Sequence, residues 1–215
     1  MKKIAGYALL LLLAACNSPE GKNAEVGDKK AVNNSGGTTY VLDSTSLIKW
    51  AASKPTQTHE GTFAVKEGSF IVNDNNLTGG NFVIDISSLK VTDLTEKDGK
   101  GKLEGHLKSP DFFDIAKFQS SKFEITKVEP VVADSSTGMK DATHTISGNL
   151  KLKDSTKNIT FPARITIDER SMTAKADLNI DRTMWGMNYK GPGNPQDWFI
   201  SKQVNLKLDL SASKK

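Results

Sequence analysis

The chain has 215 residues, with 29 Lys and Arg against 25 Asp and Glu, and 37% of its residues are hydrophobic. This length is sufficient for one domain with a buried core. The net charge of +4 is small, and no dense Lys/Arg cluster is interleaved with aromatic residues, which argues against a nucleic-acid-binding protein.

The first segment, residues 1–15, has the layout of a secretory signal peptide. Lys2 and Lys3 precede an apolar run that is too short to span a bilayer. Cys16, the only cysteine, follows two alanines, and Leu13-Ala14-Ala15-Cys16 resembles the lipobox of bacterial lipoproteins. We expect cleavage before Cys16, whose acyl groups (of the palmitate type) would anchor the chain to a membrane of the cell envelope. The alternative is ordinary cleavage that leaves Cys16 as a free thiol.

Residues 16–39 have the composition of a flexible linker. Gly, Asn, Ser and Lys dominate, and Val26 and Val32 are the only large apolar residues between positions 17 and 39. As a random coil, this segment would hold the following domain on the order of 25 Å from its anchor.

Residues 40–215 form the predicted domain, in which short segments alternate apolar and polar residues with the period of half-buried strands. The pattern is clearest in residues 146–152, 159–168, 174–180 and 204–210. Hairpin-length links separate several of these segments, so neighbouring strands should be antiparallel. About eight such strands must close into a barrel or stack as a sandwich, so the predicted fold class is all-β.

One segment, residues 91–118, interrupts this pattern. Three leucines among charged residues predict a short helix that ends before Ser109. Three nearby glycines each weaken a helix by about 1 kcal/mol relative to Ala, so we expect it to be poor or broken. The apolar loop 111–114 that follows should pack against the mouth of the barrel.

Several motifs resemble those of the YceI-like family, and they occur in the family's order. They are His106–Asp114 (HLKSPDFFD), followed by Phe118 and Ser121-Lys122-Phe123; Gly148–Leu152, followed by Thr156-Lys157; and Asp181–Met187 (DRTMWGM). The resemblance covers residues 40–211. It implies one antiparallel lipocalin-like barrel whose apolar tunnel holds an isoprenoid or a similar long-chain, fatty-acid-like lipid, with no metal, nucleotide or catalytic machinery. The glycine-rich helix and the loop 191–199 depart from the family's pattern.

The alternation nominates inward-facing residues as the wall of such a tunnel. These candidates are Trp50, Phe63, Phe82, Ile84, Phe123, Leu150, Phe161, Leu178, Ile180 and Leu206. From the residues alone, packing into a solid core is favoured over a tunnel, and the resemblance reverses that preference. Phe112, Phe113 and Phe118 would gate or plug the mouth, and Trp185 is a further candidate ligand contact.

Arg182 continues the apolar face of the segment that contains Leu178 and Ile180. A guanidinium group there must be paired, because burying an uncompensated charge is costly. It would either recognise a polar or anionic lipid head or form a salt bridge with Asp111 or Asp114. We favour the salt bridge.

The histidines at positions 59, 106 and 144 lack the spacing of a metal site. His106 lies near two aspartates and could act as a base, but we favour a hydrogen bond from it to the loop backbone. The sequence thus predicts a non-catalytic, periplasm-facing or outer-membrane lipoprotein whose partners are a lipid and a membrane. The pattern is also compatible with a homodimer. The alternatives are a stress-related binding protein with a filled barrel and a hydrolase that uses His106.

Overall fold

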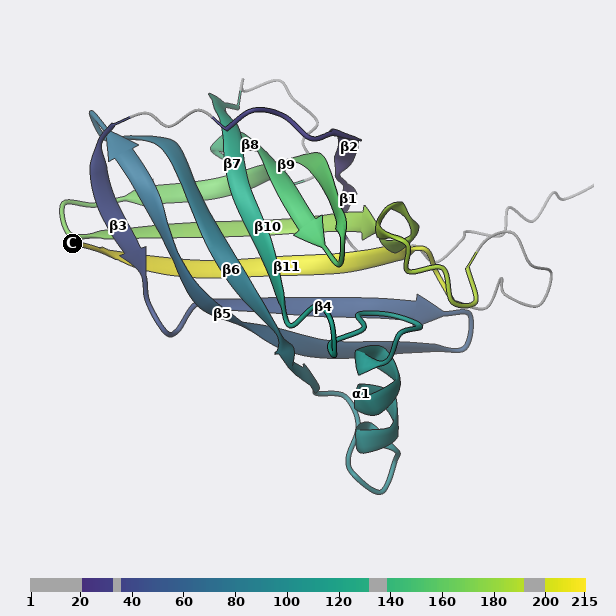
Figure 1. Cartoon of the computed structure of the whole chain (residues 1–215). Coiled ribbons are helices and arrows are strands. Elements are labelled where there is room, and N and C mark those ends of the chain that lie inside the picture. Colours follow the sequence, from purple (N-terminus) through teal and green to yellow (C-terminus); the bar gives the residue numbers. More distant parts are fainter. Residues whose placement is uncertain (1–20, 33–35, 132–138, 192–199) are drawn as a thin grey trace, which may run out of the picture.

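The computed structural model describes residues 21–32, 36–131, 139–191 and 200–215. Within these ranges, eight strand positions form a closed antiparallel barrel (Figure 1), which confirms the predicted fold class. The proposed signal peptide, Cys16 and most of the loop 191–199 lie outside the described residues.

The barrel is built in the order of the sequence, apart from its closure. Its strands are β3 (Thr38–Leu42), β4 (Leu47–Lys54), β5 (Gln57–Asn73), β6 (Asn76–Val91), β7 (Ser120–Pro130), β8 (His144–Leu152), β9 (Ser155–Ile167), β10 (Ser171–Asp181) and β11 (Gln203–Lys214). β3 and β4 share one position, because both pair with β5 on one side and β11 on the other. Antiparallel pairing of β9 with β10 continues the sequential order, and pairing of β11 with β3 and β4 closes the ring.

Two glycines allow aromatic rings to lie directly against a neighbouring strand. A Cβ atom on Gly61 would lie 2.4 Å from Cζ2 of Trp50, and one on Gly148 would lie 2.1 Å from Cζ of Phe123. Neither position has room for a side chain, so each glycine fixes where an inward-facing ring rests.

The helix α1 (Lys100–Lys108) lies at one end of β5 and β6 (Figure 1). It ends before Ser109 as predicted, but it is an unbroken helix of nine residues, contrary to our expectation. Gly99 accounts for part of the difference, because it lies just before the helix with a φ of 93° and does not weaken its interior. The following loop caps the C-terminus of the helix. The N–H groups of Phe113 and Ile115 donate to the carbonyls of Leu107 and Lys108 (both 3.1 Å).

Residues 21–30, which we expected to belong to a flexible linker, are docked on the outside of the barrel, and we call them the N-terminal strap. The strap contains β1 (Lys22–Asn23), which pairs in parallel with β10, and β2 (Glu25–Asp28), which pairs antiparallel with β9. The linker prediction is therefore wrong for this segment.

The strap occupies a seam between β9 and β10. These two strands pair with each other only as far as Ala163 and Ala176. Beyond that point β1 lies beside residues 178–179 of β10, and β2 lies beside residues 157–160 of β9. The strap thus supplies the strand pairing that β9 and β10 do not give each other.

Four asparagines lie buried on the outer face of the barrel in this region. They are Asn149, Asn158, Asn179 and Asn205, one from each of the strands β8 to β11, and none is more than 3% exposed. The Asn179 amide donates to the Gly21 carbonyl (2.9 Å), and Asn205 donates to the Asn179 amide oxygen (3.0 Å). On the other side, Asn158 donates to the amide oxygen of Asn149 (3.1 Å).

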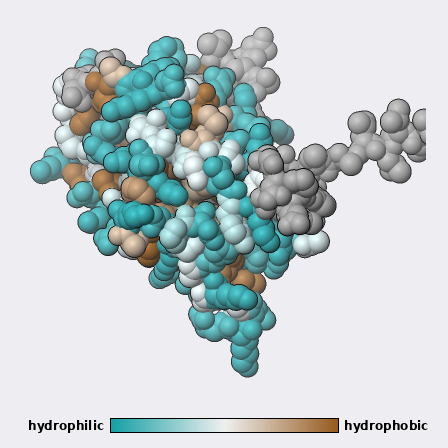
Figure 2. Space-filling model, turned by 45° about the vertical axis from the view of Figure 1, so that its right-hand side comes forward, coloured by the Kyte–Doolittle hydropathy of each residue, from teal (hydrophilic) through white to brown (hydrophobic). Residues whose placement is uncertain are grey.

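Much of the remaining outer surface is hydrophilic, as the teal areas of Figure 2 show for one face. This agrees with strands that direct their apolar faces inward. None of the helices in the described part of the chain is long and apolar enough to cross a membrane.

Candidate ligand-binding cavity

An apolar cavity of about 250 Å³ lies inside the barrel. This volume is close to the lower end of the range for small-molecule sites, about 300 Å³. The predicted residues that line it are Trp50, Phe63, Phe82, Ile84, Phe112, Phe113, Phe123, Leu150, Phe161, Leu178, Ile180, Arg182 and Leu206. The barrel interior therefore contains an open space as well as packed side chains.

Two of the predicted aromatic residues are not part of the wall. Trp185 belongs to the short helix η1 (Arg182–Trp185) and is 1% exposed, but it lies behind the wall, where its Nε1 donates to the Leu150 carbonyl (3.1 Å). Phe118 is half-buried and also lies outside the wall. Trp185 holds β8 in place, and its prediction as a residue lining the cavity is wrong.

One side of the cavity is lined by α1 and by the loop that follows it. Leu103 and Leu107 of α1 line the cavity, although we did not nominate them. Their spacing of four residues, which places two side chains on one helical face, was the available signal. Phe113 packs edge-to-face on Phe63, with ring centroids 5.5 Å apart, and so joins the loop to the barrel wall.

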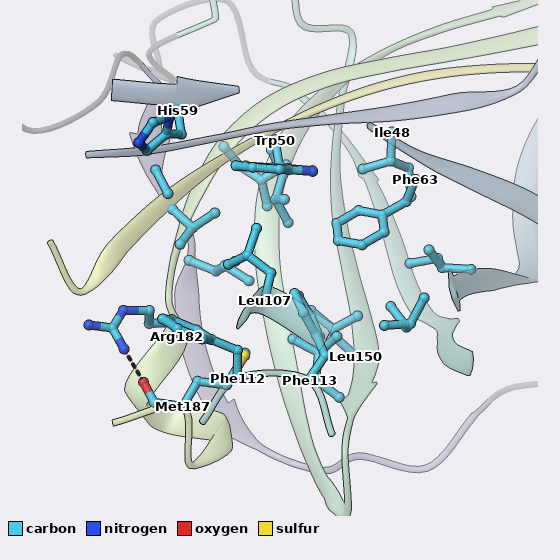
Figure 3. Close-up of a pocket in the computed structure, with 18 of the residues that line it drawn as sticks. Ile48, Trp50, His59, Phe63, Leu107, Phe112, Phe113, Leu150, Arg182 and Met187 are labelled. Atoms are coloured by element: carbon cyan, nitrogen blue, oxygen red, sulfur yellow. Dashed lines mark hydrogen bonds between the residues drawn. The ribbon is translucent and has the colours of Figure 1, made fainter. Parts of the chain in front are cut away.

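Phe112 is the second loop aromatic at the mouth, and it packs in a cluster with His106 and Tyr189. The centroid distances are 5.2 Å from His106 to Phe112 and 4.8 Å from His106 to Tyr189. Figure 3 shows Phe112, Phe113 and Leu107 facing the cavity together. Leu107, Phe112 and Phe113 thus form one side of the cavity.

His106 bonds to a side chain and not to the loop backbone that we favoured. Its Nε2 lies 3.0 Å from Oδ2 of Asp111, and both side chains are substantially exposed. In the described ranges, no group of three or more His, Cys, Asp or Glu side chains is arranged to hold a metal ion.

Arg182 is buried at the mouth, with only 3% of its surface exposed. The favoured salt bridge is wrong: Asp111 pairs with His106, and Asp114 pairs with Lys117 (3.1 Å). The reason is local, since the loop places both carboxylates beside cations or a histidine of their own segment.

The guanidinium group of Arg182 donates to backbone carbonyls. Nε donates to Ser201 (3.0 Å), Nη2 to Ile200 (3.3 Å), and Nη1 to Met187, the last drawn in Figure 3. Burial lowers the pKa of Arg182, and the nearby carboxylate of Asp181 opposes this shift. Arg182 thus joins the chain after η1 to the chain that enters β11.

Asp93 binds the beginning of β5 (Gln57–Asn73). It accepts hydrogen bonds from the Glu60 N–H (2.9 Å) and interacts with Nδ1 of His59 (2.8 Å), a residue of the cavity wall. Burial of Asp93 disfavours its charge, but these hydrogen bonds outweigh that effect and lower its pKa.

Comparison with known protein families identifies this barrel. Residues 40–212 match the model of the YceI-like domain. The chain belongs to the YceI-like family. The N-terminal strap precedes the matched residues, so it is an addition to the part of the YceI-like domain that the family model describes.

Solved structures share the fold of this YceI-like chain. BcnA of Burkholderia cenocepacia superposes with a TM-score of 0.60 at 16% identity, covering 80% of this chain and 99% of BcnA. A polyisoprenoid binding domain from Saccharophagus degradans gives 0.58 at 16% identity, covering 83% and 99%. The YceI protein of Campylobacter jejuni gives 0.50 at 19% identity, covering 70% and 83%. None of the functionally curated proteins matches the chain.

Proposed function

We propose that this YceI-like protein binds a long-chain lipid, an isoprenoid or a similar molecule, inside its barrel and acts as a non-catalytic carrier or sequestering protein. The observation that carries the proposal is the apolar cavity whose wall is built from inward-facing side chains of the barrel strands. The polyisoprenoid binding domain from Saccharophagus degradans, which has the same fold, supports the choice of ligand class.

The proposed affinity comes from the hydrophobic effect. Burial of apolar surface contributes about 25 cal/mol per Å², so a long hydrocarbon chain is held without many polar contacts. Lipid entry and release would involve movement of the loop 109–118 away from Phe63, because Phe112 and Phe113 of that loop line the cavity and Phe113 packs on Phe63.

We further propose that Cys16 is lipidated and anchors the protein to an envelope membrane, facing the periplasm. The strap begins at Gly21, so residues 16–20 alone would connect the anchor to the barrel. Five residues reach at most about 18 Å. The anchor would therefore stay within about 18 Å of the start of the strap, whereas a coil of residues 16–39 would span about 25 Å on average and more when extended.

A blocked cavity tests the lipid-binding proposal. Leu206 on β11 lines the cavity, and Leu206→Trp should fill part of it and weaken the uptake of a fluorescent long-chain fatty acid. Asp209 lies on the same strand with an exposed side chain, so Asp209→Trp is the matched control and should bind like the parent chain. Equal uptake by both variants would contradict binding in the barrel.

A separate experiment tests the anchor. Cys16→Ser removes the thiol that would be acylated, so the variant should move from the membrane fraction to the soluble fraction after cell disruption. A variant that remains with the membranes would refute lipidation at Cys16.

A further inference from the structure

The cavity wall contains a buried hydrogen-bond donor without a partner. Trp50 on β4 is 6% exposed, and its indole Nε1 makes no hydrogen bond within the described residues. Buried N–H groups are nearly always paired, because they lose their hydrogen bonds to water when they are buried. An unpaired indole N–H in a cavity wall therefore needs an explanation.

The second buried indole of the described chain shows the usual arrangement. Trp185 donates to the Leu150 carbonyl at 3.1 Å and lies outside the cavity wall. The two indoles differ in their surroundings: Trp185 meets backbone, whereas Trp50 faces the interior of the barrel. The Trp50 side chain lines the cavity, and no atom of the described chain accepts a hydrogen bond from its Nε1.

The Trp50 ring is held in one place. It rests against Gly61 of the paired strand, where even a methyl group would collide with Cζ2. In Figure 3 the nitrogen edge of the ring is turned toward the side of the cavity formed by Ile48 and Phe63. The position of the indole N–H along the barrel axis is therefore fixed.

The lining residues determine the chemistry that this donor favours. No Asp or Glu belongs to the wall in the described ranges, and no acceptor of the wall reaches Nε1 of Trp50, so an acceptor for this donor would come from the ligand. The Lys and Arg residues of the wall are Lys54 and Arg182, at the ends of β4 and β10.

Trp50 lies deeper in the barrel than Lys54 and Arg182. It pairs with Leu206, which in turn pairs with Leu178, so the three residues lie at one level of the barrel. Lys54 and Arg182 are each four residues further along their chains, or about 13 Å at the rise of a β-strand. An anion at Trp50 would be buried without a counter-charge, which is costly.

We propose that Nε1 of Trp50 donates a hydrogen bond to an uncharged oxygen of the bound lipid: a carbonyl, ether or hydroxyl oxygen. This inference rests on the proposed function, and it specifies the ligand as a long apolar molecule with a neutral oxygen acceptor inside the barrel. Trp50 is the positioning contact for that oxygen, and the surrounding apolar wall holds the hydrocarbon.

The test compares two probes of equal length, a long-chain methyl ketone and the corresponding alkane, on the purified chain after removal of bound lipid. The parent chain should prefer the ketone by about fivefold to tenfold, the value of one buried hydrogen bond. Trp50→Phe should reduce this ratio to about one, whatever it does to the two affinities. Replacing Trp50 with 3-benzothienylalanine, which keeps the shape of the indole but has no N–H, should do the same.

A labelled indole gives a direct reading of the bond. The ketone should move the Trp50 Nε1–H resonance downfield in ¹H–¹⁵N spectra and leave that of Trp185 nearly unchanged, because Trp185 already has a partner. An unaltered ketone preference in both Trp50 variants, or no preference in the parent chain, would overturn this inference while lipid binding stood. Failure to bind either probe would instead overturn the proposed function.

Discussion

Asn149 holds the backbone of Lys30 with both polar atoms of its side-chain amide. Its Oδ1 accepts from the Lys30 N–H at 3.0 Å, and its Nδ2 donates to the Lys30 carbonyl at 2.7 Å. The two residues are 119 positions apart, so this contact joins the end of the N-terminal strap to β8. The strap is thereby part of the folded domain.

Asn149→Ala should loosen the strap, because it removes both of these hydrogen bonds and the one from Asn158. Leaving buried polar groups unpaired costs about 1–3 kcal/mol. We expect a lower melting temperature and faster amide hydrogen exchange in residues 25–28. Asn81→Ala, at an exposed asparagine of β6, is the control and should change neither quantity. Unchanged exchange in the strap of the Asn149 variant would show that the contact does not hold it.

Glycine-to-alanine substitutions should have opposite effects at two positions. Gly148→Ala places a methyl group 2.1 Å from the Phe123 ring and should destabilise the chain by about 1–3 kcal/mol. Gly105→Ala, in the open interior of α1, meets nothing within 4 Å and should stabilise the helix by about 0.5–1 kcal/mol. Thermal unfolding of both variants measures this difference. A Gly148 variant as stable as the parent chain would contradict the close packing of Phe123.

Arg182→Lys should lower stability, because one ammonium group cannot reach the three carbonyls that the guanidinium group serves. Unpaired buried carbonyls cost about 1–3 kcal/mol. Thermal unfolding should show this loss of stability. At a temperature where the variant stays folded, its binding free energy for a fatty acid should decrease by less than its free energy of unfolding does. A loss of affinity without any loss of stability would instead indicate that Arg182 recognises the head of the lipid.

His144 should make stability depend on pH. Burial lowers the pKa of its imidazole in the folded state below the ordinary value of about 6.5. As the pH falls below that value, the unfolded chain binds a proton before the folded chain does, so stability declines. The contribution is complete above about pH 6.5 and is lost as the pH falls through the lower folded pKa. Melting temperatures at pH 7.5 and 5.5 should differ less for His144→Gln than for the parent chain; equal differences would exclude His144 as the source.

The sequence predicted the strands and most of the cavity wall because both depend on a local pattern. Alternation with a period of two identifies which side chains of β8, such as Leu150, face inward once the barrel closes. The contacts of Trp185 and Arg182 were harder to predict. β10 ends at Asp181, where the helix η1 begins, so the period of two no longer applies to these residues.

The strap could not be predicted from its own composition. The strap contacts β9 and β10 through backbone pairing. Its polar and small side chains give no sequence pattern from which this pairing could be predicted. The relevant information lies in other strands, where Asn149, Asn158 and Asn179 stand on the outer face and look like ordinary solvated residues. Only the folded arrangement shows that a second segment covers them.

Direct identification of the cavity's contents tests the central proposal most simply. The purified chain is extracted with organic solvent and the extract is analysed by mass spectrometry. The mass of the intact protein is measured separately by native mass spectrometry. We expect about one intact long-chain lipid per chain, carrying a neutral oxygen and lost on extraction. An extract free of lipid, together with a stripped protein that takes up no long-chain probe, would contradict lipid binding in the barrel.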